Sequence, residues 1–210
     1  IRPHHHALAL TLQVRDDLLH EIDSLTKAAA MDTTIIVLPN VNQYDNDQDY
    51  GRSRLKGALE SFFETDGMVE AAFVTDVVMT IDSLYRTIPD KQHRAIAGLS
   101  MGGYHSLHIS KYYPDLFDYG GLFSAAARFH EDSDCPVYKD EKKQIDTQFA
   151  KGLKLYWIAI GNEDFLYDEN VKLRAYLDEK GYPYEYYENG EGHIWKNWRI
   201  YLTEFVPKLF

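Results

Sequence analysis

The stretch that most constrains the fold of this chain is Gly98-Leu99-Ser100-Met101-Gly102, in which a serine lies between two glycines. Residues 93–97 before it predict a short buried strand, and residues 103–110 after it predict the start of a helix. Between a strand and a helix, G-x-S-x-G predicts a sharp turn that exposes the serine hydroxyl, because the glycines at both ends tolerate the backbone bend. Ser100 is therefore the predicted nucleophile.

A serine hydroxyl is a poor nucleophile at neutral pH, so it needs a histidine base and an acid that orients the base. With this turn, the partners follow in the order serine, acid, histidine. Four histidines come after Ser100. His105 and His108 lie on the helix that the serine begins, so we expect them at its surface or in packing. His130 lies in a charged stretch, and we expect it to be solvated.

The fourth histidine, His193, is the predicted base. It lies in a glycine-containing loop, residues 189–195, after the strand-like Tyr/Glu alternation of residues 184–188. A terminal helix is expected to begin near Trp195. Such a loop can present an imidazole at the end of a strand.

The acid should follow the preceding strand, which is the continuous apolar run 154–160. Three carboxylates occur in the loop that comes next: Glu163, Asp164 and Asp168. Asp164 is the aspartate nearest the strand, and we predict it as the acid. Glu163 and Asp168 remain alternatives, and any of the three could instead cap the helix expected over residues 171–180.

The order of elements predicts an α/β fold with a mainly parallel sheet and helices on both faces. Strand-like and helix-like segments alternate along the chain, and the active site of such a sheet lies at the carboxyl ends of its strands. Besides those above, we expect buried strands at 33–40 and 118–125. The inner face of a helix is predicted from Phe73, Val77, Ile81 and Leu84.

Composition limits the other possibilities. With 210 residues, 45% of them hydrophobic, the chain is expected to form one domain over residues 1–210. A formal charge of −11 without a basic cluster predicts no nucleic-acid or membrane partner. The single Cys135 excludes an intrachain disulfide. Residues 45–56 resemble a calcium loop, but Gly51 stands at the seventh position and Lys56 at the twelfth, so we expect no metal and no cofactor.

The stretch 96–104 resembles the serine turn of the putative-esterase family of α/β-hydrolases, which includes feruloyl and acetylxylan esterases of carbohydrate esterase family 1 and tributyrin-type esterases. Residues 161–167 resemble the family's acid loop, with its aspartate at Asp164, and residues 192–195 resemble its histidine loop, with His193. The similarity runs from about Asp16 to the C-terminus. It implies an α/β-hydrolase fold and ester hydrolysis through a covalent acyl-enzyme.

The resemblance also implies two backbone donors for the oxyanion, one of them the N–H of Met101. The other normally comes from a His-Gly loop upstream of residues 35–38, and this chain has no His-Gly pair. We expect the family's usual N-terminal strands to be lacking, with residues 7–12 a poor substitute. We therefore expect either a piece of a longer enzyme or an oxyanion hole that is built differently.

By this resemblance, the expected substrates are feruloyl or acetyl esters of plant cell-wall polysaccharide. A general short-chain carboxylesterase, an acyl transferase and a non-catalytic carbohydrate-binding relative remain alternatives. Trp195 and Trp198 could border the pocket, but we expect them to hold the His193 loop against the terminal helix. Relatives that act on polymers are exported, which implies a secreted or periplasmic protein, although this chain shows no signal peptide. Substrate-binding residues and oligomeric state are not predicted.

Overall fold

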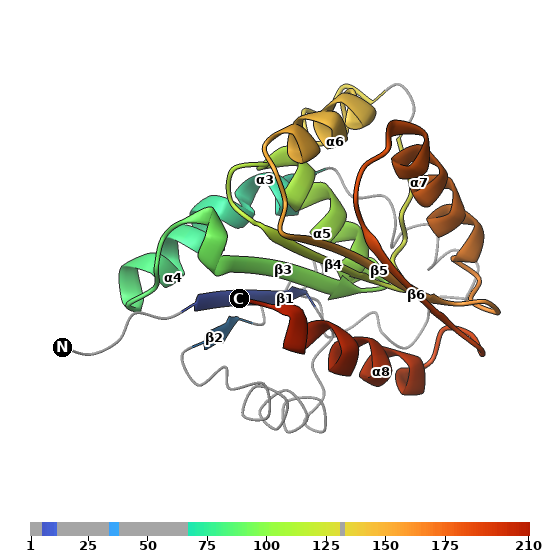
Figure 1. The fold of residues 1–210 in the computed structure, drawn as a ribbon. Coiled ribbons are helices and arrows are strands. Elements are labelled where there is room, and N and C mark those ends of the chain that lie inside the picture. The colour runs from blue at the N-terminus through green and yellow to red at the C-terminus, as the bar shows by residue number, and fades with distance from the viewer. Residues whose placement is uncertain (1–5, 12–33, 38–66, 131–132) are drawn as a thin grey trace, which may run out of the picture.

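The computed structural model describes residues 6–11, 34–37, 67–130 and 133–210, which form one six-stranded sheet with helices packed on it. The strand order is β2-β1-β3-β4-β5-β6, and every pairing is parallel (Figure 1). The strands are β1 (His6–Thr11), β2 (Thr34–Val37), β3 (Arg94–Leu99), β4 (Tyr119–Phe123), β5 (Leu155–Gly161) and β6 (Glu185–Asn189). The predicted parallel α/β fold is confirmed.

Helices cover both faces of the sheet, as predicted (Figure 1). Five of them, α3 to α7, lie over one face, and α8 lies over the other. The helices are α3 (Met68–Phe73), α4 (Met79–Leu84), α5 (Met101–Tyr112), α6 (Glu141–Ala150), α7 (Tyr167–Lys180) and α8 (Trp195–Phe205). A π-helical turn, Val74–Val78, joins α3 to α4, and short 3₁₀ turns occur at Lys91–His93 and Val206–Lys208.

Successive residues of the central strands enter different cores, because side chains alternate across a sheet. In β3, Ala95 and Ala97 belong to the core beneath α8, whereas Ile96 packs with Phe73 and Ile109 on the opposite face. Both faces are therefore apolar, which explains the continuous hydrophobic runs of the central strands.

The position of β1 corrects one expectation about the N-terminal part of the chain. We expected residues 7–12 to be a poor substitute for a missing strand, but β1 is an interior strand that pairs with both β2 and β3. Its last residue, Thr11, is in register with Gly98. A strand upstream of β2 is thus present beside the serine strand. Residues 12–33, which follow it, lie outside the described residues.

Two further expectations needed correction. The strand β2 is half-buried rather than buried, because it lies at the edge of the described sheet. On the predicted amphipathic helix, Phe73 is buried but Leu84 is 69% exposed. The π turn widens the helix by about one residue per turn, so Val78 rather than Val77 occupies the buried position after Phe73. The apolar face therefore shifts before it reaches Leu84.

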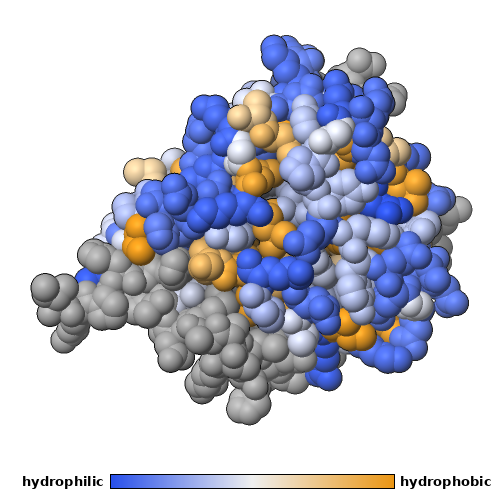
Figure 2. All heavy atoms as spheres, in the orientation of Figure 1, coloured by the Kyte–Doolittle hydropathy of each residue, from blue (hydrophilic) through white to orange (hydrophobic). Residues whose placement is uncertain are grey.

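On the face that Figure 2 shows, the described surface is mostly hydrophilic, with small hydrophobic areas scattered over it. Among the helices of the described residues, none has the length and apolar character needed to cross a membrane.

Close packing of α5 on the sheet depends on Gly103. A Cβ atom at this position would lie 2.5 Å from the Cβ of Ala125 and 2.8 Å from its Cα. It would also lie 3.1 Å from the carbonyl oxygen of Gly98. Since these neighbours are mostly backbone, they cannot move aside as a flexible side chain would. The absent side chain at Gly103 lets the helix that follows Ser100 approach the segment just after β4.

We predict that Gly103→Ala lowers the free energy of unfolding by about 1–3 kcal/mol, because the added methyl group overpacks this contact. Urea denaturation of the variant and the wild type measures the change. Gly190→Ala is the matched control, since a Cβ atom at Gly190 meets open space. Equal unfolding midpoints for the two variants would contradict the role of the close approach.

Candidate active site

Ser100 stands between β3 and α5 with a φ of 56° and a ψ of −113°. A residue with a side chain adopts such angles at a cost of about 1–3 kcal/mol, so the surroundings must hold it. Its N–H donates to the Phe123 carbonyl at 2.9 Å. Its own carbonyl accepts from the N–H groups of Tyr104, at 3.0 Å, and Ala126, at 3.2 Å. Backbone bonds on both sides thus fix the turn that was predicted from the glycines.

The structure brings Ser100, His193 and Asp164 together at the carboxyl ends of three strands. The His193 Nε2 lies 2.8 Å from the Ser100 Oγ. The His193 Nδ1 lies 2.9 Å from the Asp164 Oδ2 and 3.1 Å from the Oδ1. Each distance allows a hydrogen bond. The three side chains therefore form one continuous line from carboxylate to hydroxyl.

Asp164 is buried, with 4% of its surface exposed. Its Oδ1 also accepts a hydrogen bond from the backbone N–H of Leu166 at 3.0 Å. Burial opposes ionisation of the carboxyl group, but the hydrogen bonds from His193 and Leu166 outweigh that cost. The pKa of Asp164 therefore lies below its ordinary value. The group is a carboxylate at neutral pH, which suits the partner of an imidazolium.

The loop that carries His193 is held in place by Asn197, which lies in the first turn of α8. Asn197 is 1% exposed, and its Nδ2 donates to the carbonyls of Gly190, at 3.1 Å, and Gly192, at 3.0 Å. Its Oδ1 accepts from the Asn189 Nδ2 at 2.8 Å, and Tyr201 in turn donates to the Asn189 Oδ1 at 2.8 Å. The amide thus fixes the backbone that leads into His193. Sequence reasoning missed Asn197, whose only signal was its place just after the loop.

Two aromatic rings flank the His193 imidazole. The ring centroid of Phe165 lies 4.7 Å from that of His193, and the Trp198 centroid lies 4.9 Å away in an edge-on arrangement. Trp198 belongs to α8, so its contact with His193 supports its predicted role in holding the loop against that helix, and Trp195 packs against Trp198. Phe165 is different, because 63% of its surface is exposed. It leaves an open aromatic face beside the imidazole.

The other histidines after Ser100 do not join this site. His105 is buried and pairs with Glu70, with 2.7 Å between its Nδ1 and the Oε1. His108 is also fully buried. The expectation that His130 is solvated was wrong, because its ring is half-buried and its Nδ1 lies 3.0 Å from the Oε1 of Glu141. Packing within the fold, as predicted for the two helical histidines, accounts for their burial.

The two alternative acids do not contact His193. Glu163 and Asp168 are both exposed. Asp168 lies in the first turn of α7, where a carboxylate interacts favourably with the positive end of the helix. This agrees with the capping alternative for Asp168.

Met101 begins α5 directly after Ser100, so its N–H belongs to the first turn of a helix, where N–H groups lack intrahelical partners. The positive end of the helix dipole favours negative charge at this point. The expected position of the Met101 donor therefore suits an oxyanion. The segment 38–66, which includes the calcium-like loop, lies outside the described residues.

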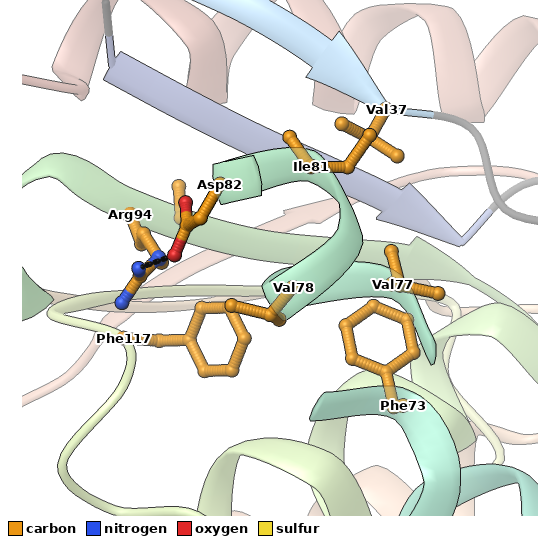
Figure 3. Close-up of a pocket in the computed structure, with 9 residues that line it drawn as sticks. Val37, Phe73, Val77, Val78, Ile81, Asp82, Arg94 and Phe117 are labelled. Carbon is orange, nitrogen blue, oxygen red and sulfur yellow. Dashed lines mark hydrogen bonds and ion pairs between the residues drawn. The ribbon is translucent and has the colours of Figure 1, made fainter. Parts of the chain in front are cut away.

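An apolar pocket lies far from this site, at the other end of β3 (Figure 3). Its lining includes Phe73, Val78 and Phe117, with the Arg94–Asp82 ion pair at one side. Arg94 begins β3 and Ser100 follows its end, so the strand separates them by about 20 Å. The pocket volume of about 20 Å³ has room for little more than one water molecule. It cannot hold an ester substrate.

Comparison with known families identifies the chain. The sequence model of the family described as "Putative esterase" matches residues 18–209. The chain belongs to this family. Curated relatives and solved structures with which the chain can be compared carry esterase and hydrolase names.

Two curated relatives have related names. The chain is 28% identical over 142 residues to an endo-1,4-beta-xylanase/feruloyl esterase of Xylanibacter ruminicola, a match that covers 67% of the chain but 18% of that protein. It is 27% identical over 159 residues to an acetyl esterase of Caldicellulosiruptor saccharolyticus, covering 62% of the chain and 60% of that protein. The chain thus matches less than two thirds of the length of either relative.

Solved structures share the fold. A ferulic acid esterase aligns with a TM-score of 0.70 at 21% identity, over 98% of this chain and 84% of that one. A carbohydrate esterase family 1 ferulic acid esterase of Anaeromyces mucronatus gives 0.73 at 16% identity, over 99% and 79%. An S-formylglutathione hydrolase of Staphylococcus aureus gives 0.69 at 18%, over 98% and 84%. The α/β-hydrolase fold is thereby confirmed.

We predict that Asn197→Ala lowers kcat for ester hydrolysis by up to about 10²-fold, because the His193 loop loses the amide that fixes it and a small displacement of a catalytic group has effects of this size. Steady-state kinetics with p-nitrophenyl acetate measures the change. Asn162→Ala is the control, since Asn162 is an exposed side chain near the same loop. Equal kcat values for the two variants would contradict the positioning role.

Proposed function

We propose that this chain is a serine esterase in which Ser100 is the nucleophile, His193 the base and Asp164 the acid that orients the base. The observation that carries the proposal is the unbroken line of hydrogen-bond distances from Asp164 through His193 to the Ser100 Oγ. Since Asp164 faces the Nδ1 of His193, the proton stays on that nitrogen and the lone pair of Nε2 faces the serine hydroxyl.

The cycle has two halves. The Ser100 Oγ attacks the ester carbonyl while His193 Nε2 takes its proton, which forms a tetrahedral oxyanion. The carbon–oxygen bond to the alcohol then breaks, and His193 returns the proton to the leaving alcohol. Water repeats the same steps on the acyl-enzyme, releases the carboxylic acid and restores Ser100. Throughout, the Asp164 carboxylate stabilises the imidazolium.

The oxyanion is stabilised by the backbone N–H of Met101 at the start of α5. One such donor contributes about 3–4 kcal/mol to lowering the barrier in serine hydrolases. The strained turn at Ser100 fixes this N–H relative to the nucleophile, so the donor needs no rearrangement during the reaction.

The substrate that we propose is a feruloyl ester of plant cell-wall polysaccharide, with acetyl esters as the second choice. The exposed face of Phe165 beside His193 supports an aromatic acyl group, which it can stack on. The names of the relatives point in the same direction. Such polymers lie outside the cell, so the proposal includes export, and residues 1–210 would act as one catalytic domain.

We predict that Ser100→Ala lowers kcat for p-nitrophenyl acetate by about 10⁴-fold or more, because the three side chains act as a unit. Ser110→Ala is the control, since the Ser110 hydroxyl only bonds the Leu107 carbonyl within the same helix. Most of the activity should remain in the control. A Ser100→Ala enzyme with near-normal turnover would refute the assignment.

We predict that Phe165→Ala lowers kcat/KM for methyl ferulate about three- to tenfold, the size of one aromatic contact, while the value for p-nitrophenyl acetate changes little. Parallel assays on both esters measure the ratio. Tyr85→Ala is the control, since Tyr85 is 52% exposed but follows α4, at the opposite end of the sheet. Equal losses on both esters, or hydrolysis of the acetate alone by the wild type, would favour a short-chain esterase.

A further inference from the structure

A second cluster of titratable side chains lies apart from the serine site, on the sheet face that α5 and α6 cover. His108 comes from α5, His130 from the segment after β4, and Glu141 from the first residue of α6. The His130 Nδ1 lies 3.0 Å from the Glu141 Oε1, and the His108 Nδ1 lies 3.4 Å from the Oε2. The three ligand atoms all lie within 4.8 Å of one another. Folding thus brings together two imidazoles and a carboxylate from three separate segments.

His108 has polar atoms that its surroundings do not satisfy. The residue is 0% exposed, and neither ring nitrogen makes a hydrogen bond of ordinary geometry with a described residue. A neutral imidazole has one ring nitrogen whose lone pair can bind a cation. A buried polar group of this kind calls for a partner, such as an ion.

The contacts of His130 allow it to bind a metal ion. Its Nε2 lies 3.1 Å from the Tyr104 hydroxyl oxygen, and its ring stacks on Tyr138 with centroids 4.1 Å apart. In the tautomer with a proton on Nε2, that N–H donates to Tyr104, and the lone pair of Nδ1 points toward Glu141. Outer hydrogen bonds that fix the tautomer in this way are typical of metal sites.

Lys111 is the group that competes with a cation. Its Nζ lies 3.3 Å from the Glu141 Oε2, but it also donates to the Val137 carbonyl at 2.7 Å and to the Gln144 Oε1 at 3.0 Å. Two acceptors therefore hold the ammonium group at the side of the cluster. Lys111 balances the Glu141 charge without a metal, and it does not contribute a hydrogen bond to His108.

We propose that His108, His130 and Glu141 bind a divalent transition-metal ion such as zinc, with water as the fourth ligand. Zinc takes nitrogen and oxygen ligands at about 2.0–2.2 Å, which places tetrahedral ligand atoms about 3.3 Å apart. The His130 Nδ1 lies 3.0 Å from the Glu141 Oε1 and the His108 Nδ1 lies 3.4 Å from the Oε2, so both imidazoles face the carboxylate at about this spacing, one at each oxygen. Two imidazoles favour zinc over calcium or magnesium, which prefer oxygen.

The ion would stabilise the fold rather than act on the ester. His108 lies eight residues beyond Ser100, which is about 12 Å along a helix. Bound there, the metal would tie α5 to α6 and to the segment after β4. The helix α5, which follows the nucleophile, would thereby be held in place by these two neighbouring segments. This inference is independent of the proposed ester substrate.

The test uses the full chain after treatment with EDTA and removal of the chelator. Because the sequence has a separate histidine run at residues 4–6, the background protein carries His4→Ala and His5→Ala. Zinc chloride is then titrated, with bound metal measured by mass spectrometry and Tm by calorimetry. We expect about one zinc per chain and, at a hundredfold excess over Kd, a Tm rise of about 5 °C or more.

His130→Ala and Glu141→Gln should each abolish both the bound zinc and the Tm rise. His130 is half-buried, so its variant should fold even if changes at His108 do not. His93→Ala is the control, because His93 lies outside the cluster and pairs with Asp90. No zinc bound by the background protein, or equal zinc bound by the His130→Ala variant, would overturn the site and leave a buried network centred on Lys111 and Glu141.

Discussion

The left-handed backbone at Ser100 is the constraint on which the site depends. Its φ of 56° costs free energy, and that cost is offset by backbone bonds to Phe123 and Ala126 and by the close packing of Gly103 on Ala125. Because β3 and β4 are parallel neighbours, both sets of contacts come from adjacent elements. The same turn aims the serine hydroxyl, begins α5 and presents the Met101 N–H. The backbone geometry of this one turn therefore serves both the proposed chemistry at Ser100 and the packing of α5.

Much of the site was predictable, because it follows from position along the chain. Ser100 directly follows β3, while Asp164 and His193 lie in the short loops after β5 and β6, and parallel strands place their carboxyl ends at one edge of the sheet. The glycine spacing around Ser100 predicted its turn, and apolar runs predicted the central strands. These signals are local in the sequence, and the folded chain adds only that the three residues meet at one site.

What could not be predicted depends on contacts between distant segments. The placement of β1 between β2 and β3 follows from pairing partners far along the chain. One π turn moved the buried face of a helix and left Leu84 exposed. Asn197 holds the His193 loop only through tertiary hydrogen bonds, and the burial of His130 follows from its stacking on Tyr138 and its contact with Glu141. No pattern in the sequence predicts such contacts.

The central claim is that His193 activates Ser100 for covalent attack. A p-nitrophenyl phosphonate tests it directly, since the serine oxygen attacks phosphorus and releases p-nitrophenolate. Peptide mass spectrometry of the labelled protein should place one adduct per chain on Ser100, with labelling strongly slowed in His193→Ala. An adduct on a different residue, or ester hydrolysis that continues without any adduct, would contradict the account.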